Sequence, residues 1–219
     1  MQYQAVIFDL DGTLLDTLAD LTAAVNHVLQ RVRVNPIDTT ACRRMIGNGA
    51  RVLIQRALQA RQIPVEPGEL DRLLQQFLTY YARHKFDQTR PYEGVPHVLD
   101  TLTERGYRLA VLSNKPHPAT VEMVNELLDR WHFDPVFGQR ADVPLKPDPT
   151  AALMICETLI LAPHQVAFVG DSGEDMATAK AAGMFAVGVT WGMREESDLR
   201  THGADVIVHH PEQLLQVLV

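Results

Sequence analysis

The chain has 219 residues, 46% of them hydrophobic, and a formal net charge of -7. This length and composition allow a full core and suit one α/β domain with an inserted subdomain. The acidic excess argues against nucleic acid as a partner, and no apolar stretch approaches the roughly 20 residues that span a bilayer. The amino terminus reaches Asp9 without a basic and apolar leader, and Cys42 and Cys156 lack a metal-ligand spacing. We therefore expect a cytoplasmic protein with no membrane segment.

The first predicted strand covers about residues 4–9 and opens into a glycine turn, Asp9-Leu10-Asp11-Gly12-Thr13. Side chains alternate along a strand, so Asp9 and Asp11 start toward the same side unless the turn re-aims the second. Two carboxylates so close repel, unless a cation lies between them or one holds a proton. A divalent metal is the simplest solution, and oxygen ligands without a nearby His or Cys favour Mg2+. In the alternative interpretation Asp9 caps a helix and Asp11-Gly12 is only a turn.

A mostly helical stretch follows from about 16 to 85. Between positions 15 and 90, ten arginines and one lysine stand against seven acidic residues, so this part is basic by about +4 and the remainder is near -11. We expect most of these arginines on solvated helix faces, with one or two available to an anionic ligand. Apolar residues at helical spacing predict the packed face of a small bundle, and they include Leu18, Leu21, Val25, Leu73 and Phe77.

The segment Gly47-Asn48-Gly49-Ala50-Arg51 interrupts this helical pattern. A backbone with flanking glycines can approach a ligand closely, which makes Asn48 and Arg51 the candidates for substrate contact in the helical stretch. The alternative is an interhelical turn without a ligand.

After residue 91 the pattern changes to alternating strands and helices. Strands and helices that alternate in this way form parallel sheets, and ligands bind at the carboxyl edge of the strands in open parallel sheets. We interpret Trp191-Gly192-Met193-Arg194, which follows a strand, as a packing and loop feature. Helices are expected near 95–105, 117–128, 149–160 and 174–182, and strands at 108–112, 135–138, 166–169, 185–189 and 205–208. This order predicts an α/β fold with a Rossmann-like, doubly wound parallel sheet.

Three later segments bring polar groups to the same edge as Asp9. Ser113-Asn114 follows the strand at 108–112, and Asp171 follows the strand at 166–169. Lys146 lies between them in the sequence, before a proline that holds the backbone out of a helix. In the alternative interpretation Lys146 is only a solvated lysine in a loop.

Together with Asp9-Leu10-Asp11-Gly12-Thr13, these three segments resemble, in their order along the chain, the four motifs of the haloacid dehalogenase-like hydrolase superfamily. The resemblance covers essentially the whole chain. It implies that Asp9 is a nucleophile that forms an aspartyl-phosphate. Asp11 would protonate the departing alkoxide and then take a proton from water, while its backbone carbonyl helps to hold the metal. Ser113 and Lys146 would bind the transferring phosphoryl oxygens.

The remaining motif residues complete the implied site. Gly12, Thr13 and Asn114 are expected to bind the substrate, and Asp171 to complete the Mg2+ shell that Asp9 and Asp11 begin. Asp175 fits two roles equally well. It could serve the metal site or orient Lys146, or it could simply cap a helix that begins after Ser172.

The resemblance further implies that the helical stretch, residues 16–87, is a mobile cap inserted into a core made of residues 1–15 and 88–219. Its hinges would lie near Asp16 and between Asp87 and Pro91. Caps of this kind suit small soluble substrates, which are enclosed before chemistry proceeds. Similar glycine-asparagine-glycine segments occur in phosphoglycolate phosphatases, the branch of the superfamily that the chain resembles most.

The function expected from this resemblance is Mg2+-dependent hydrolysis of a small phosphomonoester, with 2-phosphoglycolate as the leading substrate. Dehalogenases lack the second acidic residue, which is Asp11 here. Phosphonate hydrolases need a cap lysine, and the only lysine before residue 115 is Lys85. A phosphosugar mutase, a pyrophosphatase and a non-catalytic phosphate-binding protein stay open as alternatives. The oligomeric state cannot be read from the sequence.

Overall fold

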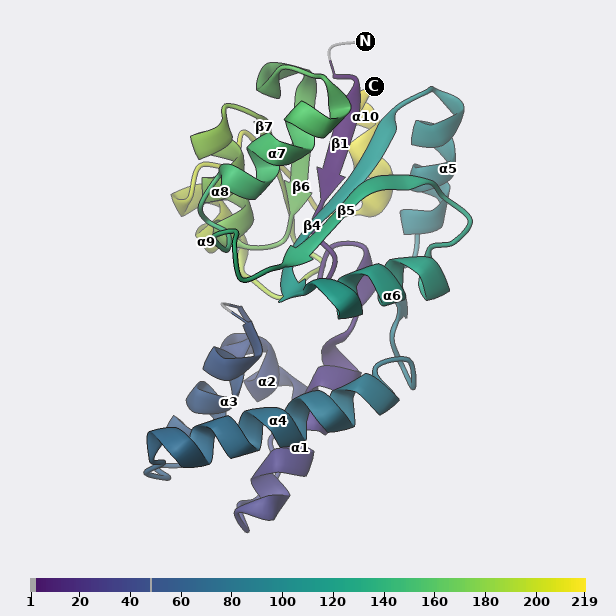
Figure 1. The fold of residues 1–219 in the computed structure, drawn as a ribbon. Helices are drawn as coiled ribbons and strands as arrows, with labels where there is room; N and C mark the ends of the chain where they lie inside the picture. Colours follow the sequence, from purple (N-terminus) through teal and green to yellow (C-terminus); the bar gives the residue numbers. More distant parts are fainter. Residues whose placement is uncertain (1–2, 48) are drawn as a thin grey trace. The chain divides into compact units, whose positions relative to one another are not determined.

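The computed structural model describes residues 3–47 and 49–219, and its centre is a six-stranded sheet (Figure 1). The strand order is β5-β4-β1-β6-β7-β8, and every neighbouring pair is parallel. The predicted parallel sheet is therefore confirmed. Its strands are β1 (Ala5–Phe8), β4 (Arg108–Pro116), β5 (Phe133–Gln139), β6 (Val166–Gly170), β7 (Phe185–Val189) and β8 (Val206–Val208).

Strand β1 lies at the point where the direction of strand addition reverses. The chain adds β4 and β5 on one side of β1 and then β6, β7 and β8 on the other. Phe8 pairs in register with Val111 of β4 and Val169 of β6, so these three strands end close together. Ligands of open parallel sheets bind at such a reversal point.

Helices cover both faces of the sheet, as a doubly wound fold requires (Figure 1). On β1, Val6 and Phe8 face one apolar core and Ala5 and Ile7 face the other, because strand side chains alternate. Each buried aliphatic or aromatic side chain stabilises the fold by roughly 1.5–3 kcal/mol. The first core is closed by α5 (Val95–Glu104), α6 (His117–Leu127) and α10 (Leu214–Leu218), and the second by α7 (Thr150–Leu159), α8 (Gly173–Ala182) and α9 (Glu196–Thr201).

A second compact unit, Asp16–Arg90, is inserted between β1 and the rest of the sheet. It has its own apolar core, in which the predicted packed face is confirmed by the burial of Leu21, Val25, Leu73 and Phe77. Its helices are α1 (Leu18–Arg31), α2 (Thr39–Met45), α3 (Gly49–Gln59) and α4 (Pro67–His84).

The inserted unit begins and ends at a small separate sheet. Strand β2 (Leu15–Asp16) pairs with β3 (Arg90–Pro91), so the two crossing segments lie side by side. The Asp20 side chain of α1 is buried and accepts hydrogen bonds from the backbone N–H groups of Gln88 and Thr89 and from the Thr89 hydroxyl. These contacts tie residues 88 and 89 to the inserted unit, which ends three residues later than the 16–87 boundary predicted from the sequence.

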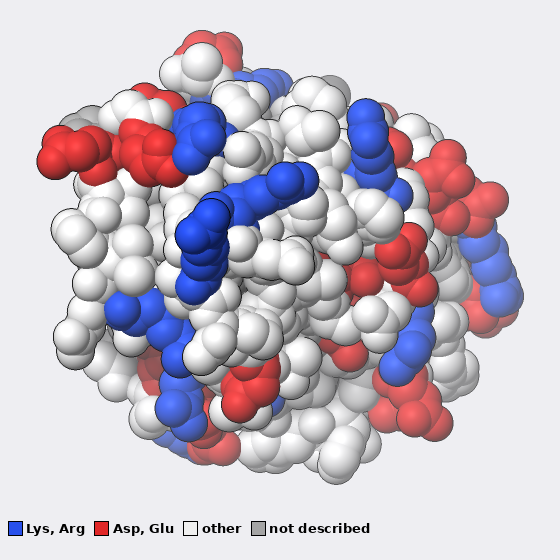
Figure 2. All heavy atoms as spheres, turned by 90° about the horizontal axis from the view of Figure 1, so that it is seen from below, with Lys and Arg blue, Asp and Glu red and all other residues white. Residues whose placement is uncertain are grey.

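Charged side chains of both signs are spread over the face seen in Figure 2, and no continuous basic surface covers it. Within the inserted unit, Arg51 forms an exposed ion pair with Asp71, and Arg72 forms one with Glu69. Among the described residues, no helix has the length and apolarity that a membrane span needs.

Candidate functional site

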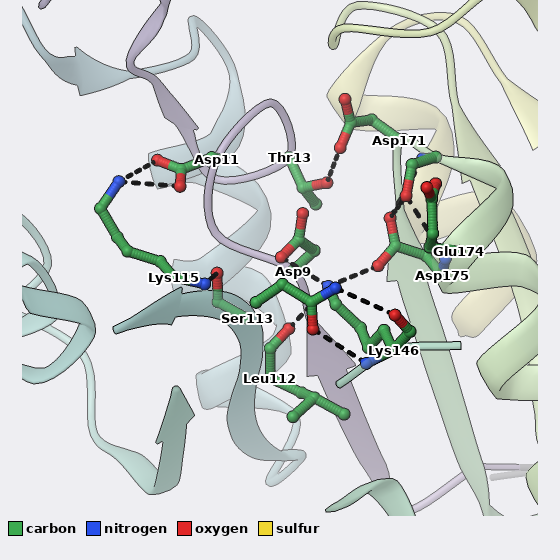
Figure 3. A network of polar contacts seen from close by, with 12 residues as sticks. Asp9, Asp11, Thr13, Leu112, Ser113, Lys115, Lys146, Asp171, Glu174 and Asp175 are labelled. Atoms are coloured by element: carbon green, nitrogen blue, oxygen red, sulfur yellow. Dashed lines mark hydrogen bonds and ion pairs between the residues drawn. The ribbon is translucent and has the colours of Figure 1, made fainter. Parts of the chain in front are cut away.

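The polar residues predicted at the sheet edge come together at the carboxyl ends of β1, β4 and β6 (Figure 3). Asp9 follows β1 directly, and its backbone N–H donates to the carbonyl of Val169 in β6. Asp171 follows β6 in the same way. Ser113 lies within the last part of β4 and is buried. The strands thus place two carboxylates and a hydroxyl at one edge.

Lys146 lies at the centre of a buried polar network. Its Nζ lies 2.8 Å from Asp9 Oδ1 and 2.6 Å from Asp175 Oδ1, and it donates to the carbonyl of Leu112 at 3.0 Å. The lysine side chain is only 4% exposed. Burial by itself lowers the pKa of Lys146, but the charges of Asp175 and Asp9 outweigh it and raise the pKa above its ordinary value. The side chain therefore stays cationic, and its burial excludes the solvated loop lysine of the alternative interpretation.

Asn114 holds the backbone that carries this lysine. Its side-chain amide donates to the Lys146 carbonyl at 3.0 Å, and its Oδ1 accepts from the Lys146 N–H at 2.9 Å. Both ends of the amide are used in this pair. Asn114 thus positions Lys146 in the structure, and its contact with a substrate stays a prediction.

Asp171 is enclosed by two loops. Its Oδ1 accepts from the Thr13 hydroxyl at 3.2 Å, and its Oδ2 accepts from the Met193 N–H at 2.6 Å. Gly12 has a φ of +88°, and an added Cβ there would overlap the Asp171 carboxylate; an added Cβ at Gly192 would do the same. Glycine is thus needed at both positions for the loops to close over Asp171.

Asp175 fulfils both of the roles left open by the sequence. Its Oδ2 accepts from the N–H of Ser172 at 3.0 Å and from the Ser172 hydroxyl at 2.6 Å, which completes a capping box at the start of α8. Its Oδ1 binds Lys146. The helix start therefore fixes the carboxylate that orients the lysine.

Asp11 does not lie in this network. The turn re-aims its carboxylate toward Lys115, whose Nζ is 2.8 Å from both oxygens (Figure 3). The repulsion expected between Asp9 and Asp11 is thus relieved by a separate cation for each, Lys146 and Lys115.

The described carboxylates that could hold one metal ion are Asp9, Asp171 and Asp175, whose ligand oxygens lie within 4.8 Å of one another. Burial, with the charge of Asp175 added and that of Lys146 partly offsetting it, raises the pKa of Asp9 to about 7. Burial and the charges of Asp9 and Asp175 raise the pKa of Asp171 well above its ordinary value. Both shifts arise first from burial, and the neighbouring carboxylates add to it.

The charges of the site agree with a divalent cation. When all are ionised, the four carboxylates of Asp9, Asp11, Asp171 and Asp175 outnumber the ammonium groups of Lys115 and Lys146 by two. All the donors are hard oxygens, as Mg2+ prefers. The Asp175 carboxylate accepts three side-chain or backbone hydrogen bonds, that of Asp171 accepts two, and that of Asp9 accepts one from Lys146, so Asp9 and Asp171 have more capacity left for a metal than Asp175.

The other predicted substrate contacts are placed as follows. Gly12 and Thr13 pack against Asp171, and Ser113 Oγ accepts from the Lys115 N–H at 3.3 Å. Arg51 forms an exposed ion pair with Asp71. Asn48 lies outside the described residues. The contacts of Gly12, Thr13, Ser113 and Arg51 with a substrate stay predictions.

Lys115 and the loop at 191–193 were not assigned to the site from the sequence. Trp191 Nε1 donates to the carbonyl of Thr13 at 3.1 Å, and Met193 binds Asp171 through its backbone. The available signals were a lysine directly after Ser113-Asn114 and a glycine just beyond a buried strand.

A parallel sheet with a buried carboxylate, a buried lysine and an acidic cluster at its reversal point is the arrangement of an α/β enzyme with its site at the carboxyl edge of the strands. The chain belongs to the haloacid dehalogenase-like hydrolase family, whose model matches residues 6–189.

Relatives in this family are similar over nearly their whole length. The chain is 36% identical over 212 residues to a phosphoglycolate phosphatase of Mesorhizobium japonicum, and this alignment covers 95% of this chain and 92% of that protein. It is 32% identical to an N-acetylmuramic acid 6-phosphate phosphatase of Pseudomonas aeruginosa, over 100% of this chain and 96% of the other. The crystal structure of a predicted phosphoglycolate phosphatase from Haemophilus somnus superposes with a TM-score of 0.92 at 30% identity and covers 100% and 99% of the two chains.

Proposed function

We propose that the protein is a Mg2+-dependent phosphomonoesterase that works through an aspartyl-phosphate on Asp9. The observation that carries this proposal is the buried Asp9 carboxylate, held through Oδ1 by Lys146 and lying within an acidic cluster. The hydrolase family and the phosphatases among its relatives support the reaction class.

In the first half of the reaction an Asp9 oxygen forms a bond to phosphorus and the bond from phosphorus to the alcohol oxygen breaks. The electron pair stays on the departing oxygen, which takes a proton from the Asp11 carboxyl group. Lys146, fixed by Asp175 and Asn114, orients Asp9 and offsets charge on the phosphoryl oxygens. Ser113 contributes a hydroxyl donor at the same edge.

In the second half a water oxygen attacks phosphorus and the bond from Asp9 to phosphorus breaks. Asp11 takes the proton of the water and is thereby returned to its starting form. Covalent catalysis of this type replaces one difficult displacement by two easier ones.

Asp9 and Asp171 would hold the metal, with the backbone carbonyl of Asp11 as the further ligand that the family resemblance implies. Bound Mg2+ would supply positive charge that neutralises the carboxylates and the phosphoryl group. Asp175 completes the acidic cluster and orients Lys146.

The leading substrate is 2-phosphoglycolate, and N-acetylmuramic acid 6-phosphate is the second candidate because of the relative that acts on it. Both compounds carry a carboxylate as well as a phosphomonoester. We propose that the inserted unit, which has an excess of arginine, binds this second anion.

Phosphate release tests this proposal. The panel comprises both candidate substrates, a sugar phosphate without a carboxylate, a nucleotide and pyrophosphate, each with Mg2+ and with EDTA. We expect metal-dependent turnover with preference for a carboxylate-bearing phosphomonoester. Folded protein that releases no phosphate from any compound would contradict the phosphatase, and preference for pyrophosphate would contradict the substrate class.

A further inference from the structure

The ion pair between Lys115 and Asp11 stands apart from the Asp9, Lys146 and Asp175 network (Figure 3). The Lys115 side chain is 6% exposed and that of Asp11 is 17% exposed. Burying a lysine is costly unless a partner compensates for the lost hydration. Here that compensation comes from both oxygens of the Asp11 carboxylate, at 2.8 Å each.

Lys115 is anchored through its backbone. Its N–H donates to Ser113 Oγ at 3.3 Å, and its carbonyl accepts from the Thr120 hydroxyl at 3.2 Å. An added Cβ at Gly138 of β5 would overlap this same carbonyl, so the neighbouring strand also confines it. Lys115 thus belongs to a rigid part of the sheet, whereas Asp11 lies in the loop between β1 and β2.

We propose that Lys115 is a positioning residue that fixes the carboxylate of Asp11 for proton transfer. This inference rests on the proposed function, in which Asp11 gives a proton to the leaving oxygen. A carboxylate on a loop has many orientations, and a fixed ammonium group that binds both oxygens selects one. Misplacing a reacting group by about 1 Å costs about 100-fold in rate.

The inference predicts a dependence on the leaving group. An alkoxide needs the proton of Asp11, whereas p-nitrophenolate is stable enough to leave without it. Lys115→Met should therefore lower kcat/KM about 10- to 100-fold for alkyl phosphates, but less than about 3-fold for p-nitrophenyl phosphate. We expect the same loss for 2-phosphoglycolate and for an alkyl phosphate that has no carboxylate, and we expect the loss mainly in kcat.

Three further variants isolate the effect. In an Asp11→Asn background, Lys115→Met should cause no further loss, because the lysine acts through Asp11. Lys115→Arg should restore part of the alkyl phosphate activity. Lys180→Met is the matched control, since it removes a lysine of the same compact unit that pairs with Asp205 at 2.6 Å in a more exposed position. It should leave the leaving-group dependence unchanged.

Several outcomes would overturn the inference. Equal losses for alkyl and aryl substrates, together with a lower melting temperature, would show a purely structural lysine. A higher KM confined to 2-phosphoglycolate would show a lysine that binds the substrate carboxylate. A further loss in the Asp11→Asn background would show action independent of Asp11. Failure of the proposed function is distinguishable, because the wild-type protein would then release no phosphate from any of these substrates.

Discussion

Asp9 and Lys146 form the contact on which the chemistry depends most directly. Asp9→Asn removes the nucleophile and one negative charge but keeps the size of the side chain and an oxygen for Lys146. We expect turnover to fall by at least about 1,000-fold while the fold persists. Phosphate release would measure the loss of turnover, and circular dichroism melting would check the fold. Activity like that of the wild type would contradict the aspartyl-phosphate mechanism.

Lys146 also determines stability, because it compensates for two buried carboxylates at once. Lys146→Met leaves Asp9 and Asp175 without their cation, and we expect the free energy of unfolding in EDTA to fall by about 3–5 kcal/mol. Lys180→Met removes an exposed pair and should cost no more than about 1 kcal/mol. Urea unfolding measures both values, and equal losses would mean that the buried network adds no stability of its own.

The sequence was sufficient to find the residues that lie in local motifs. Asp9, Lys146 and Asp171 each stand at a strand end or before a proline, where the pattern of neighbouring residues marks them. Lys115 and Met193 take part through contacts that bridge 104 and 22 positions. No local pattern encodes such contacts, so only the folded chain reveals them.

At the scale of elements, the buried Asp20 side chain joins α1 to the segment that follows α4. Asp20→Ala would leave the buried N–H of Thr89 without its acceptor, together with the Thr89 hydroxyl. We expect a loss of about 2–4 kcal/mol in the free energy of unfolding, since each unsatisfied buried group costs about 1–3 kcal/mol. Asp38→Ala, which removes an exposed cap of α2, is the control and should cost about 1 kcal/mol. Similar costs for the two variants in urea unfolding would contradict the special role of Asp20.

The elements themselves were predictable to different degrees. The long helices and buried strands were found because their periodicity extends over many residues. The short helices α9 and α10 were missed, since six and five residues give too little periodicity. Strand β4 continues to Pro116 instead of ending at 112, because Ser113, Asn114 and Lys115 replace the apolar pattern with site residues. The order of the strands in the sheet was not predicted from the sequence and is known from the structure.

At the scale of the whole molecule, the acidic site links stability to pH and to metal. The pKa of Asp9 in the folded chain, about 7, exceeds the value of about 3.9 expected for an unfolded chain. The resulting stabilisation is complete below the unfolded value and is lost as pH rises through the folded value. The metal-free protein should therefore lose stability from this source between about pH 4 and pH 7.

Mg2+ should restore that stability at neutral pH. At a concentration of about 100 times Kd the gain is about 2.7 kcal/mol, or a rise of about 5–10 °C in Tm. The rise should be smaller at pH 5 than at pH 7.5, because protons compete for the same carboxylates. Thermal unfolding with and without Mg2+ at the two pH values measures the rise in Tm. Asp171→Asn should abolish most of the rise, and an undiminished rise in that variant would place the metal elsewhere.

The pairing of β2 with β3 also has a consequence for the route by which the chain folds. Ala5 of β1 pairs with Arg108 of β4, so the central pairing of the sheet must close a loop of roughly 100 residues. Once the inserted unit has folded and β2 has met β3, the effective loop shrinks to roughly 28 residues, which saves about 1.2 kcal/mol of closure entropy. Leu73→Ala, in the core of the inserted unit, should thus slow refolding that is followed by the fluorescence of Trp131 and Trp191, although both tryptophans belong to the other unit. We therefore expect the inserted unit to fold first and to bring β1 and β4 closer together.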